Sequence, residues 1–294
     1  MNEKLLDLSE KTNPFEVELF ETIANVSKKL NVAFFVVGAA ARDIILSRGY
    51  GIHTIRATED IDLGVQVLDW SHFTKLRDGL IATGKFWPDM KQAQRLIYKD
   101  SFPIDVIPFG TIADPDNSLS WPPDHEIEMS TLGFEESYRT SIRIRFRAEP
   151  VLDVYFVSLS GLALLKLISW NDNYVRRSKD AKDILLLMRT YLDAGNQERL
   201  FNEEIDLVER EDFDYILASA RLLGRDIAAI LHPKTKETVI KILDRETGDQ
   251  KRYRLVEDMM DSRKGSSDFE TVLQLLEEMK TGVLERLQNY GDLK

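Results

Sequence analysis

The chain of 294 residues contains no cysteine, which excludes disulfide bonds and thiolate metal sites. This absence agrees with a reducing compartment. No apolar run approaches the ~18 residues that a membrane-spanning helix needs. The N-terminal residues also lack the basic-then-apolar order of a signal peptide. We therefore expect a soluble, cytoplasmic protein with no membrane segment.

Positive charge is also scarce, because 39 lysines and arginines face 50 aspartates and glutamates, a formal net charge of -11. A protein with this balance is not built to coat nucleic acid, so we expect no DNA partner, although a local basic patch could still meet RNA. The length is large for a single core and suits two domains, or one domain with a large extension. We place the boundary where the composition turns helical, between residues 1–157 and 158–294.

A pair of aspartates, Asp60 and Asp62, stands at the head of an apolar alternation. From Ile61 to Val67 every second residue is apolar, the period of a half-buried strand. Side chains two apart on a strand point the same way, so the two carboxylates share a face. Like charges held that close repel, and a site that keeps them usually contains a cation. For the pair alone, a solvated acidic strand start is the commoner interpretation.

A glycine turn precedes this pair. The run Val32–Val37 predicts a buried strand that stops at Gly38, and Ala39–Leu46 predicts a helix. Free backbone N–H groups at such a helix start suit a phosphate, although a glycine there can also serve steric needs alone. Arg42, one turn into the helix, could reach a phosphate or pair with Asp43.

A third acid interrupts an otherwise apolar strand, Phe102–Phe109, at Asp105. A carboxylate inside a buried strand is costly unless it is paired or bound to a metal. Asp105 is therefore the third candidate ligand, and a hydrogen-bonded structural aspartate is the alternative.

A strictly alternating segment, Thr140–Arg147, predicts a strand with Arg143, Arg145 and Arg147 on one face. This basic stripe could meet phosphate or RNA, but an arginine-lined solvent face is the favoured interpretation. The other predicted elements are helices over Pro14–Leu30, Trp70–Thr83, Asp212–Leu231 and Asp268–Leu287, strands over Gln94–Tyr98 and Val151–Val157, and a loop over Ile112–Pro123.

A lysine among apolar residues marks the helix predicted over Ser158–Trp170. The charge of Lys166 must either extend to solvent or point into a cleft. The helix predicted next, over Ser178–Leu192, carries Asp180 and Asp183 in its first turn. The helix dipole favours acids there, so capping is the alternative to a chemical role.

The order strand, Gly38, helix, Asp60-Ile-Asp62 and then Asp105 resembles the nucleotidyltransferase superfamily. With the later lysine and the Lys-Asp-x-x-Asp pattern, it looks most like the AbiEii-type toxins of abortive-infection and type IV toxin–antitoxin systems. The family usually shows Gly-Gly or Gly-Ser where this chain has Gly38-Ala39. The resemblance covers roughly residues 30–192. It implies an α/β (α+β) fold with a mixed sheet flanked by helices, followed by an all-helical C-terminal domain.

The resemblance also implies a reaction. An acceptor hydroxyl attacks the α-phosphate of a nucleoside triphosphate, and pyrophosphate leaves, while two Mg²⁺ ions about 3.5–4 Å apart stabilise the attacking and leaving oxygens. By motif match, Asp60 and Asp62 would hold both metals, and Asp105 would complete the site beside the attacking oxygen.

The same match assigns the remaining site residues. Lys166 would contact the triphosphate, and Asp180 would assist the acceptor or orient Lys166, with Asp183 as the less certain second acid. The nucleotide-binding candidates are Gly38, Ala39, Arg42 and Lys166.

The sequence thus predicts a Mg²⁺-dependent transferase of nucleoside monophosphate to a hydroxyl of RNA, tRNA or protein, with a toxin role and a small antitoxin partner as further implications. One alternative is a transferase that modifies a small, antibiotic-like molecule, since an acidic protein suits a cationic substrate. Another is a catalytically weak binding module of the same fold, which is motivated by Gly38-Ala39, by the long gap from Gly38 to Asp60 and by the acidic charge.

Overall fold

The computed structural model describes residues 5–54, 58–99, 101–122, 128–249, 252–260 and 267–291. The chain divides into two compact units, Met1–Ser158 and Leu159–Lys294. The first is built on a mixed sheet, and in the described part of the second every regular element is helical. The predicted fold class, an α/β core followed by a helical region, is therefore confirmed.

The sheet of the N-terminal unit has eight strands in the order β1-β9-β10-β2-β3-β6-β5-β4. Three neighbouring pairs are parallel, namely β1 with β9, β10 with β2, and β3 with β6, and the other pairs are antiparallel. The strand bounds are β1 Leu5–Asp7, β2 Ala33–Val37, β3 Ile61–Gln66, β4 Phe86–Pro88, β5 Arg95–Tyr98, β6 Phe102–Phe109, β9 Ile142–Arg147 and β10 Leu152–Phe156.

Four α-helices accompany this sheet in the described residues: α1 Pro14–Leu30, α2 Gly38–Asp43, α3 Trp70–Ile81 and α4 Phe134–Arg139. Helix α1 has its predicted bounds, since Asn13 caps it by accepting from the Glu16 N–H at 2.9 Å and proline occupies its first position. The helix predicted after Gly38 is divided, because α2 continues as a π-helical segment over Ile44–Gly49.

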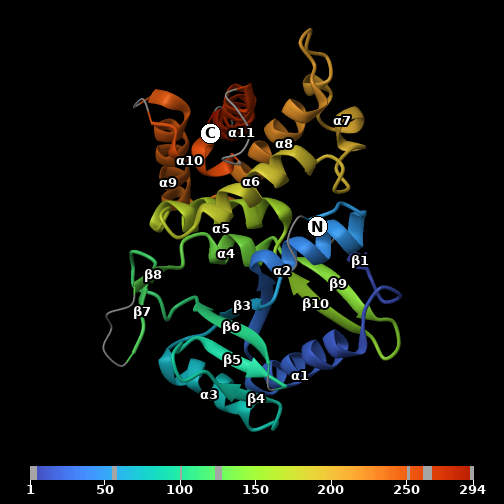
Figure 1. Ribbon diagram of the computed structural model, residues 1–294, viewed down its shortest axis with the longest axis vertical. Coiled ribbons are helices and arrows are strands. Elements are labelled where there is room, and N and C mark those ends of the chain that lie inside the picture. The colour runs from blue at the N-terminus through green and yellow to red at the C-terminus, as the bar shows by residue number, and fades with distance from the viewer. Residues whose placement is uncertain are drawn as a thin grey trace. The chain divides into compact units, whose positions relative to one another are not determined.

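The two faces of the sheet have separate aromatic cores. On one face, Phe20 of α1 packs against Phe146 and Phe156, with ring centroids 4.7 and 5.8 Å apart. On the other, Phe35 of β2 lies 6.4 Å from the ring of Phe134 in α4. Figure 1 shows α1 and α4 on opposite sides of the sheet. Because successive strand residues alternate in direction, each face has its own set of side chains.

The region predicted as a loop over residues 112–123 contains a short strand, and this part of the prediction is wrong. Strand β7, Ser118–Ser120, pairs antiparallel with β8, Glu128–Ser130, in a separate two-stranded sheet. Three-residue strands rich in serine carry no apolar period, so only the pairing reveals them. Pro123 of the predicted loop and Ala57 before the aspartate pair lie outside the described residues.

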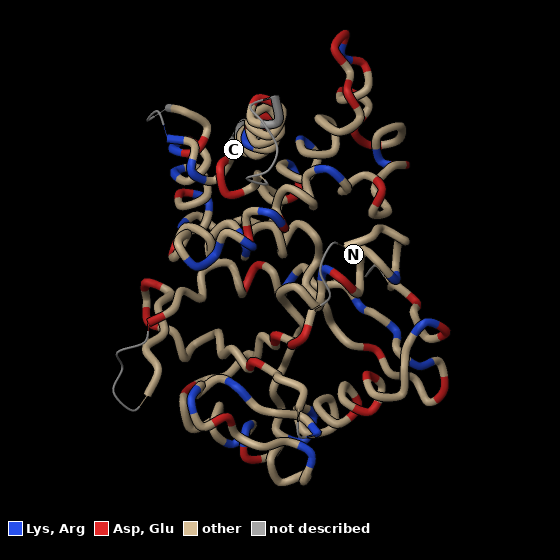
Figure 2. The backbone as a smooth tube through the Cα atoms, viewed as in Figure 1, with Lys and Arg blue, Asp and Glu red and all other residues tan. Residues whose placement is uncertain are grey.

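The basic stripe on β9 is neutralised within its own unit. Arg145 lies 2.8 Å from Asp153, Arg147 lies 2.5 Å from Glu21, and Arg143 lies 3.7 Å from Asp153. Figure 2 shows basic and acidic positions side by side on β9, β10 and α1. The stripe therefore offers much less free positive charge than its sequence suggests.

The described helices of the C-terminal unit include two long ones, α8 and α11, that cross closely. A Cβ atom on Gly224 of α8 would lie 2.0 Å from the Met279 carbonyl oxygen, and one on Gly282 of α11 would lie 2.0 Å from the Arg221 carbonyl oxygen. No described helix is both long and apolar enough to cross a bilayer. The bounds are α5 Leu159–Asp172, α6 Ser178–Thr190, α7 Arg199–Asn202, α8 Tyr215–Ile230, α9 Pro233–Asp244, α10 Arg254–Met259 and α11 Ser267–Gly291, with a 3₁₀ turn at Ile205–Leu207 and a π-helical segment at Arg245–Asp249.

The variant Gly224→Ala tests this crossing. Alanine gains about 1 kcal/mol of helix propensity over glycine, but its methyl group would overlap the backbone of α11 and force the helices apart. Overpacking costs about 1–3 kcal/mol, so we expect net destabilisation in urea unfolding monitored by circular dichroism. The control Glu237→Ala, which removes an exposed pair with Lys241, should change the stability little, because water screens exposed ion pairs. Equal or greater stability of Gly224→Ala would contradict the close crossing.

Candidate active site

Strand β3 lies between β2 and β6, so Asp62 has a neighbouring strand on each side. In the strand register, Asp62 is opposite Val37 on one side and opposite Asp105 on the other. A Cβ atom on Gly38, directly after Val37, would lie 1.9 Å from Asp62 Oδ2, and Gly38 has a φ of +72°. Both the space and the left-handed backbone require glycine here. The predicted glycine turn and the predicted aspartate strand therefore meet at Asp62.

The other two carboxylates gather around one guanidinium. Arg95 of β5 is opposite Asp105 in the antiparallel register. Its Nε and Nη2 atoms donate to the two oxygens of Asp105 at 2.7 and 2.8 Å, and Nη2 lies 3.6 Å from Asp60 Oδ2. The hydrogen bonds to Asp105 raise the pKa of Arg95, and the charge of Asp60 adds to this effect.

Sequence reasoning missed Arg95. It is the second residue of the predicted strand Gln94–Tyr98, where an arginine is compatible with an ordinary exposed position. The only signal is the register that places Arg95 opposite Asp105, and this register depends on strand pairing rather than on local pattern.

The donor chemistry of Asp60, Asp62 and Asp105 fits Mg²⁺, which prefers oxygen ligands. In the part of the chain that the structure describes, no three His, Asp or Glu side chains are clustered closely enough to hold a metal ion. Mg²⁺ is commonly held by one or two carboxylates together with water and substrate phosphates, so such a cluster is not required. Because Gly38 has no side chain, the Asp62 carboxylate lies directly against the glycine turn.

Arg42 pairs with Asp43, which is the alternative to a phosphate contact. It is only 3% exposed, and its Nε atom donates to Asp43 at 2.8 Å. Asp43 also accepts from the Thr58 hydroxyl at 2.6 Å, which connects α2 to the segment before β3. The predicted contacts of Arg42 and of the partly exposed Ala39 with nucleotide stay predictions.

The lysine and the two acids of the C-terminal unit form one buried ionic cluster. Lys166 Nζ lies 2.7 Å from Asp180 Oδ1 and 2.7 Å from Asp183 Oδ2, and all three residues are buried. Burial acts to lower the pKa of Lys166, but the charges and hydrogen bonds of both aspartates outweigh it and raise the pKa. Both acids therefore face the lysine rather than capping their helix.

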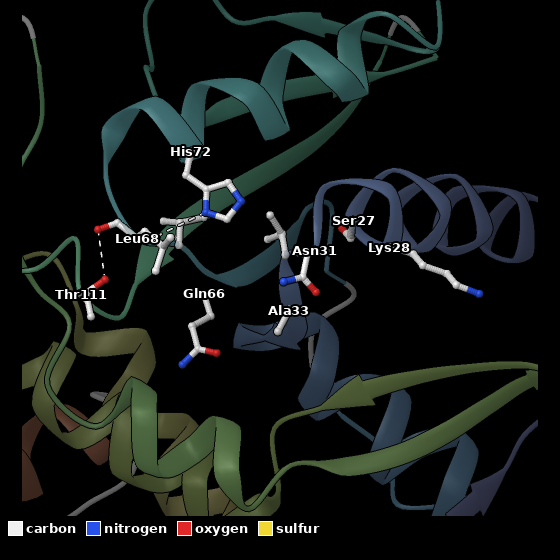
Figure 3. A pocket seen from close by; sticks show the side chains of 10 residues that line it. Ser27, Lys28, Asn31, Ala33, Gln66, Leu68, His72 and Thr111 are labelled. Carbon is white, nitrogen blue, oxygen red and sulfur yellow. Dashed lines mark hydrogen bonds between the residues drawn. The ribbon is translucent and has the colours of Figure 1, made fainter.

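A separate hollow of about 500 Å³ lies at the far end of β2 and β3. Its wall includes Ala33 and Gln66, which pair four residues along the strands from Val37 and Asp62. Figure 3 shows the amide of Gln66 directed away from the other lining side chains, and it donates to Glu135 of α4 at 3.2 Å. The His72 ring accepts from the Leu68 backbone N–H at 3.5 Å. None of the candidate carboxylates lines this hollow, so it is not the candidate active site.

The variant Gly38→Ala tests the contact between the glycine turn and Asp62. Its control is Gly51→Ala, because Gly51 has a φ of +71° but open space around its Cβ position. Both variants should lose about 1–2 kcal/mol from the left-handed backbone. Only Gly38→Ala should displace the Asp62 carboxylate and weaken binding of Mg²⁺–triphosphate in calorimetry. Equal binding by the two variants would show that this contact does not matter.

The variant Lys166→Met tests the buried cluster. It leaves two buried carboxylates without their cation, and breaking a buried pair costs about 3–5 kcal/mol. At pH 7, below the ordinary and the raised pKa of the lysine, its stabilising contribution is fully present and would be lost only in strong alkali. Urea unfolding should show this loss, and the triple variant with Asp180→Asn and Asp183→Asn should recover part of it. No recovery would argue against charge as the cause.

Comparison with known proteins places these features in a family. Residues 29–275, most of the chain, match the model described as nucleotidyl transferase AbiEii toxin, Type IV TA system. Among proteins of curated function, none has a matching sequence.

Three solved structures illustrate the structural similarity. ANT(2")-Ia in complex with adenylyl-2"-tobramycin is 15% identical, with a TM-score of 0.35, over 65% of this chain and 94% of that chain. A nucleotidyltransferase-like protein from Paracoccidioides brasiliensis is 16% identical, with a TM-score of 0.38, over 67% and 92%. The Thermotoga maritima CCA-adding enzyme complexed with tRNA is 17% identical, with a TM-score of 0.34, over 95% and 68%. TM-scores at this level carry no argument, so the assignment rests on the family match: the chain is a nucleotidyltransferase of the AbiEii family.

Proposed function

We propose that this nucleotidyltransferase moves a nucleoside monophosphate from a triphosphate to a hydroxyl of RNA, tRNA or protein, with Mg²⁺ as its metal. The observation that carries the proposal is the position of Asp62, enclosed by the Gly38 turn on one side and by Asp105 on the other. An oxygen ligand directly beside a glycine backbone, with no side chain of the turn between them, suits a metal–triphosphate complex.

In this proposal, Asp60, Asp62 and Asp105 would hold the metal, and the Gly38-Ala39 backbone would lie against the phosphates. Bound Mg²⁺ would offset the charge of the triphosphate and polarise the α-phosphate. The acceptor oxygen forms a bond to the α-phosphorus, and the bond from that phosphorus to the pyrophosphate oxygen breaks. Asp105 would complete the metal site on the side of the attacking oxygen, and the hydroxyl proton leaves to solvent.

Lys166 and Asp180 complete the proposal through the family pattern. Lys166 contacts the triphosphate, and Asp180 orients it, a role that their 2.7 Å contact supports. Asp183 holds the same ammonium group from a second direction, also at 2.7 Å. The two aspartates restrict the positions that the Lys166 ammonium group can adopt, so its charge is held in one place before a substrate binds.

A toxin role follows as a proposal from the description of the family. Adding a nucleotide to tRNA or to a protein of the translation machinery would stop growth, and a small antitoxin protein is the expected partner. Gly38-Ala39 in place of the usual Gly-Gly or Gly-Ser is compatible with activity, since the left-handed φ belongs to Gly38.

Label transfer tests the proposed reaction. The protein is incubated with Mg²⁺, each of the four α-labelled triphosphates and separate RNA, protein and aminoglycoside acceptors. We expect label on RNA or protein, and a loss of about 10³-fold or more with Asp62→Asn, because removing a dominant electrostatic contact costs roughly that much.

The matched control is Asp153→Asn, which makes the same change on the same sheet, where Asp153 pairs with Arg145. It should keep full activity, and induced expression of it should slow growth as the unaltered chain does, whereas Asp62→Asn should not. Absence of label on every acceptor, or undiminished transfer by Asp62→Asn, would overturn the proposal. Label on the aminoglycoside alone would reassign the acceptor to a small molecule.

A further inference from the structure

Arg95 is a cation that the sheet register places among the proposed metal carboxylates. It contacts both oxygens of Asp105 and lies 3.6 Å from an oxygen of Asp60. The side chains of Arg95 and Asp105 are 21% and 15% exposed, so this pair is largely shielded from water. The proposed reaction gives this arginine no role.

We propose that Arg95 is a positioning residue with two effects: it holds Asp105 in place in the metal-free protein, and it weakens the binding of free divalent cations. The inference rests on the proposed function, because it takes Asp60, Asp62 and Asp105 as the metal carboxylates. A guanidinium and a divalent cation that share carboxylates repel each other at short range. In addition, each Asp105 oxygen already accepts one hydrogen bond, which leaves fewer lone pairs for a metal.

The positioning effect follows from charge and geometry. Carboxylates brought together by strand register would repel one another without a counter-ion. The two-pronged contact of a guanidinium with a carboxylate fixes both the distance and the plane of that carboxylate. Arg95 thereby keeps Asp105 in one orientation before any substrate binds.

The effect on binding differs between a free metal ion and a metal–triphosphate complex. A free divalent cation adds positive charge beside Arg95 and is disfavoured. A metal–triphosphate complex carries net negative charge, so Arg95 does not disfavour its binding. Arg95 therefore makes the site select the metal–nucleotide complex over the free ion, because its charge opposes only the latter.

Manganese titration tests this inference on the full chain without nucleotide. Free Mn²⁺, a paramagnetic probe that also prefers oxygen ligands, is measured by electron paramagnetic resonance. Arg95→Gln should bind Mn²⁺ about tenfold or more tightly than the unaltered chain, a change of about 1.4 kcal/mol. The Mn²⁺-dependent rise in its unfolding temperature should grow accordingly. Affinity for the Mn²⁺–triphosphate complex should not increase.

Arg145→Gln is the matched control. Arg145 also makes a two-pronged cross-strand contact, to Asp153 at 2.8 and 3.1 Å, with side-chain exposures of 26% and 18%. This variant should lose comparable stability without any gain in Mn²⁺ affinity. Arg95→Lys loses the two-pronged contact but keeps the charge, and because charge repulsion opposes the ion it should stay within about threefold of the unaltered chain. Adding Asp62→Asn to Arg95→Gln should remove the gain and thereby locate the ion.

Equal or weaker Mn²⁺ binding by Arg95→Gln would overturn the inference, as would an equal gain in Arg145→Gln or Arg95→Lys. Undetectable Mn²⁺ binding by every protein would overturn it as well. The expected order of affinities together with a failed label-transfer assay would sustain the role of Arg95 and refute the proposed reaction. Label transfer without the expected order of Mn²⁺ affinities would support the proposed reaction and refute the role of Arg95.

Discussion

The alignment of three neighbouring strands, β2, β3 and β6, is the constraint on which the site depends. Strand β3 is antiparallel to β2 and parallel to β6, and this arrangement places Asp62 next to the Gly38 turn and opposite Asp105. A slip of one residue in either pairing would turn these side chains to the other face. Phe35 of β2 lies on the same face as Asp62 and packs against Phe134 of α4. This aromatic packing opposes such a slip, so the same strand register that builds the core also positions the site.

Concentrated negative charge is the second physical theme, in a chain whose formal net charge is -11. In the N-terminal unit, Arg95 offsets part of the charge of Asp60 and Asp105 while remaining partly exposed. In the C-terminal unit, Lys166 lies buried between Asp180 and Asp183. The first arrangement can yield to a metal–triphosphate complex, since its side chains are 15–40% exposed. The second cannot do so cheaply, because separating a buried pair leaves charges without solvent.

The elements that periodicity predicted well are the long ones. Helix α1 and strand β6 have the predicted bounds, because many apolar residues repeat along each and proline and asparagine mark the start of α1. The three-residue strands β1, β4, β7 and β8 were not predicted, since a strand of that length is stabilised by its neighbour rather than by its own side chains. The same holds for the π-helical continuation of α2, which no local signal announces.

The sequence alone determined the fold class and the family, because the order of its motifs along the chain carries that information. The choice of Asp60, Asp62 and Asp105 as metal ligands stays a prediction from the same order. Only the tertiary structure decided which groups contact them. Arg95 opposite Asp105, Arg42 beside Asp43, and the β9 arginines bound to Asp153 and Glu21 are all consequences of strand pairing and packing. A charged residue looks the same in the sequence whether its partner is water, a carboxylate or a phosphate, since the energy that distinguishes these partners depends on distance and burial.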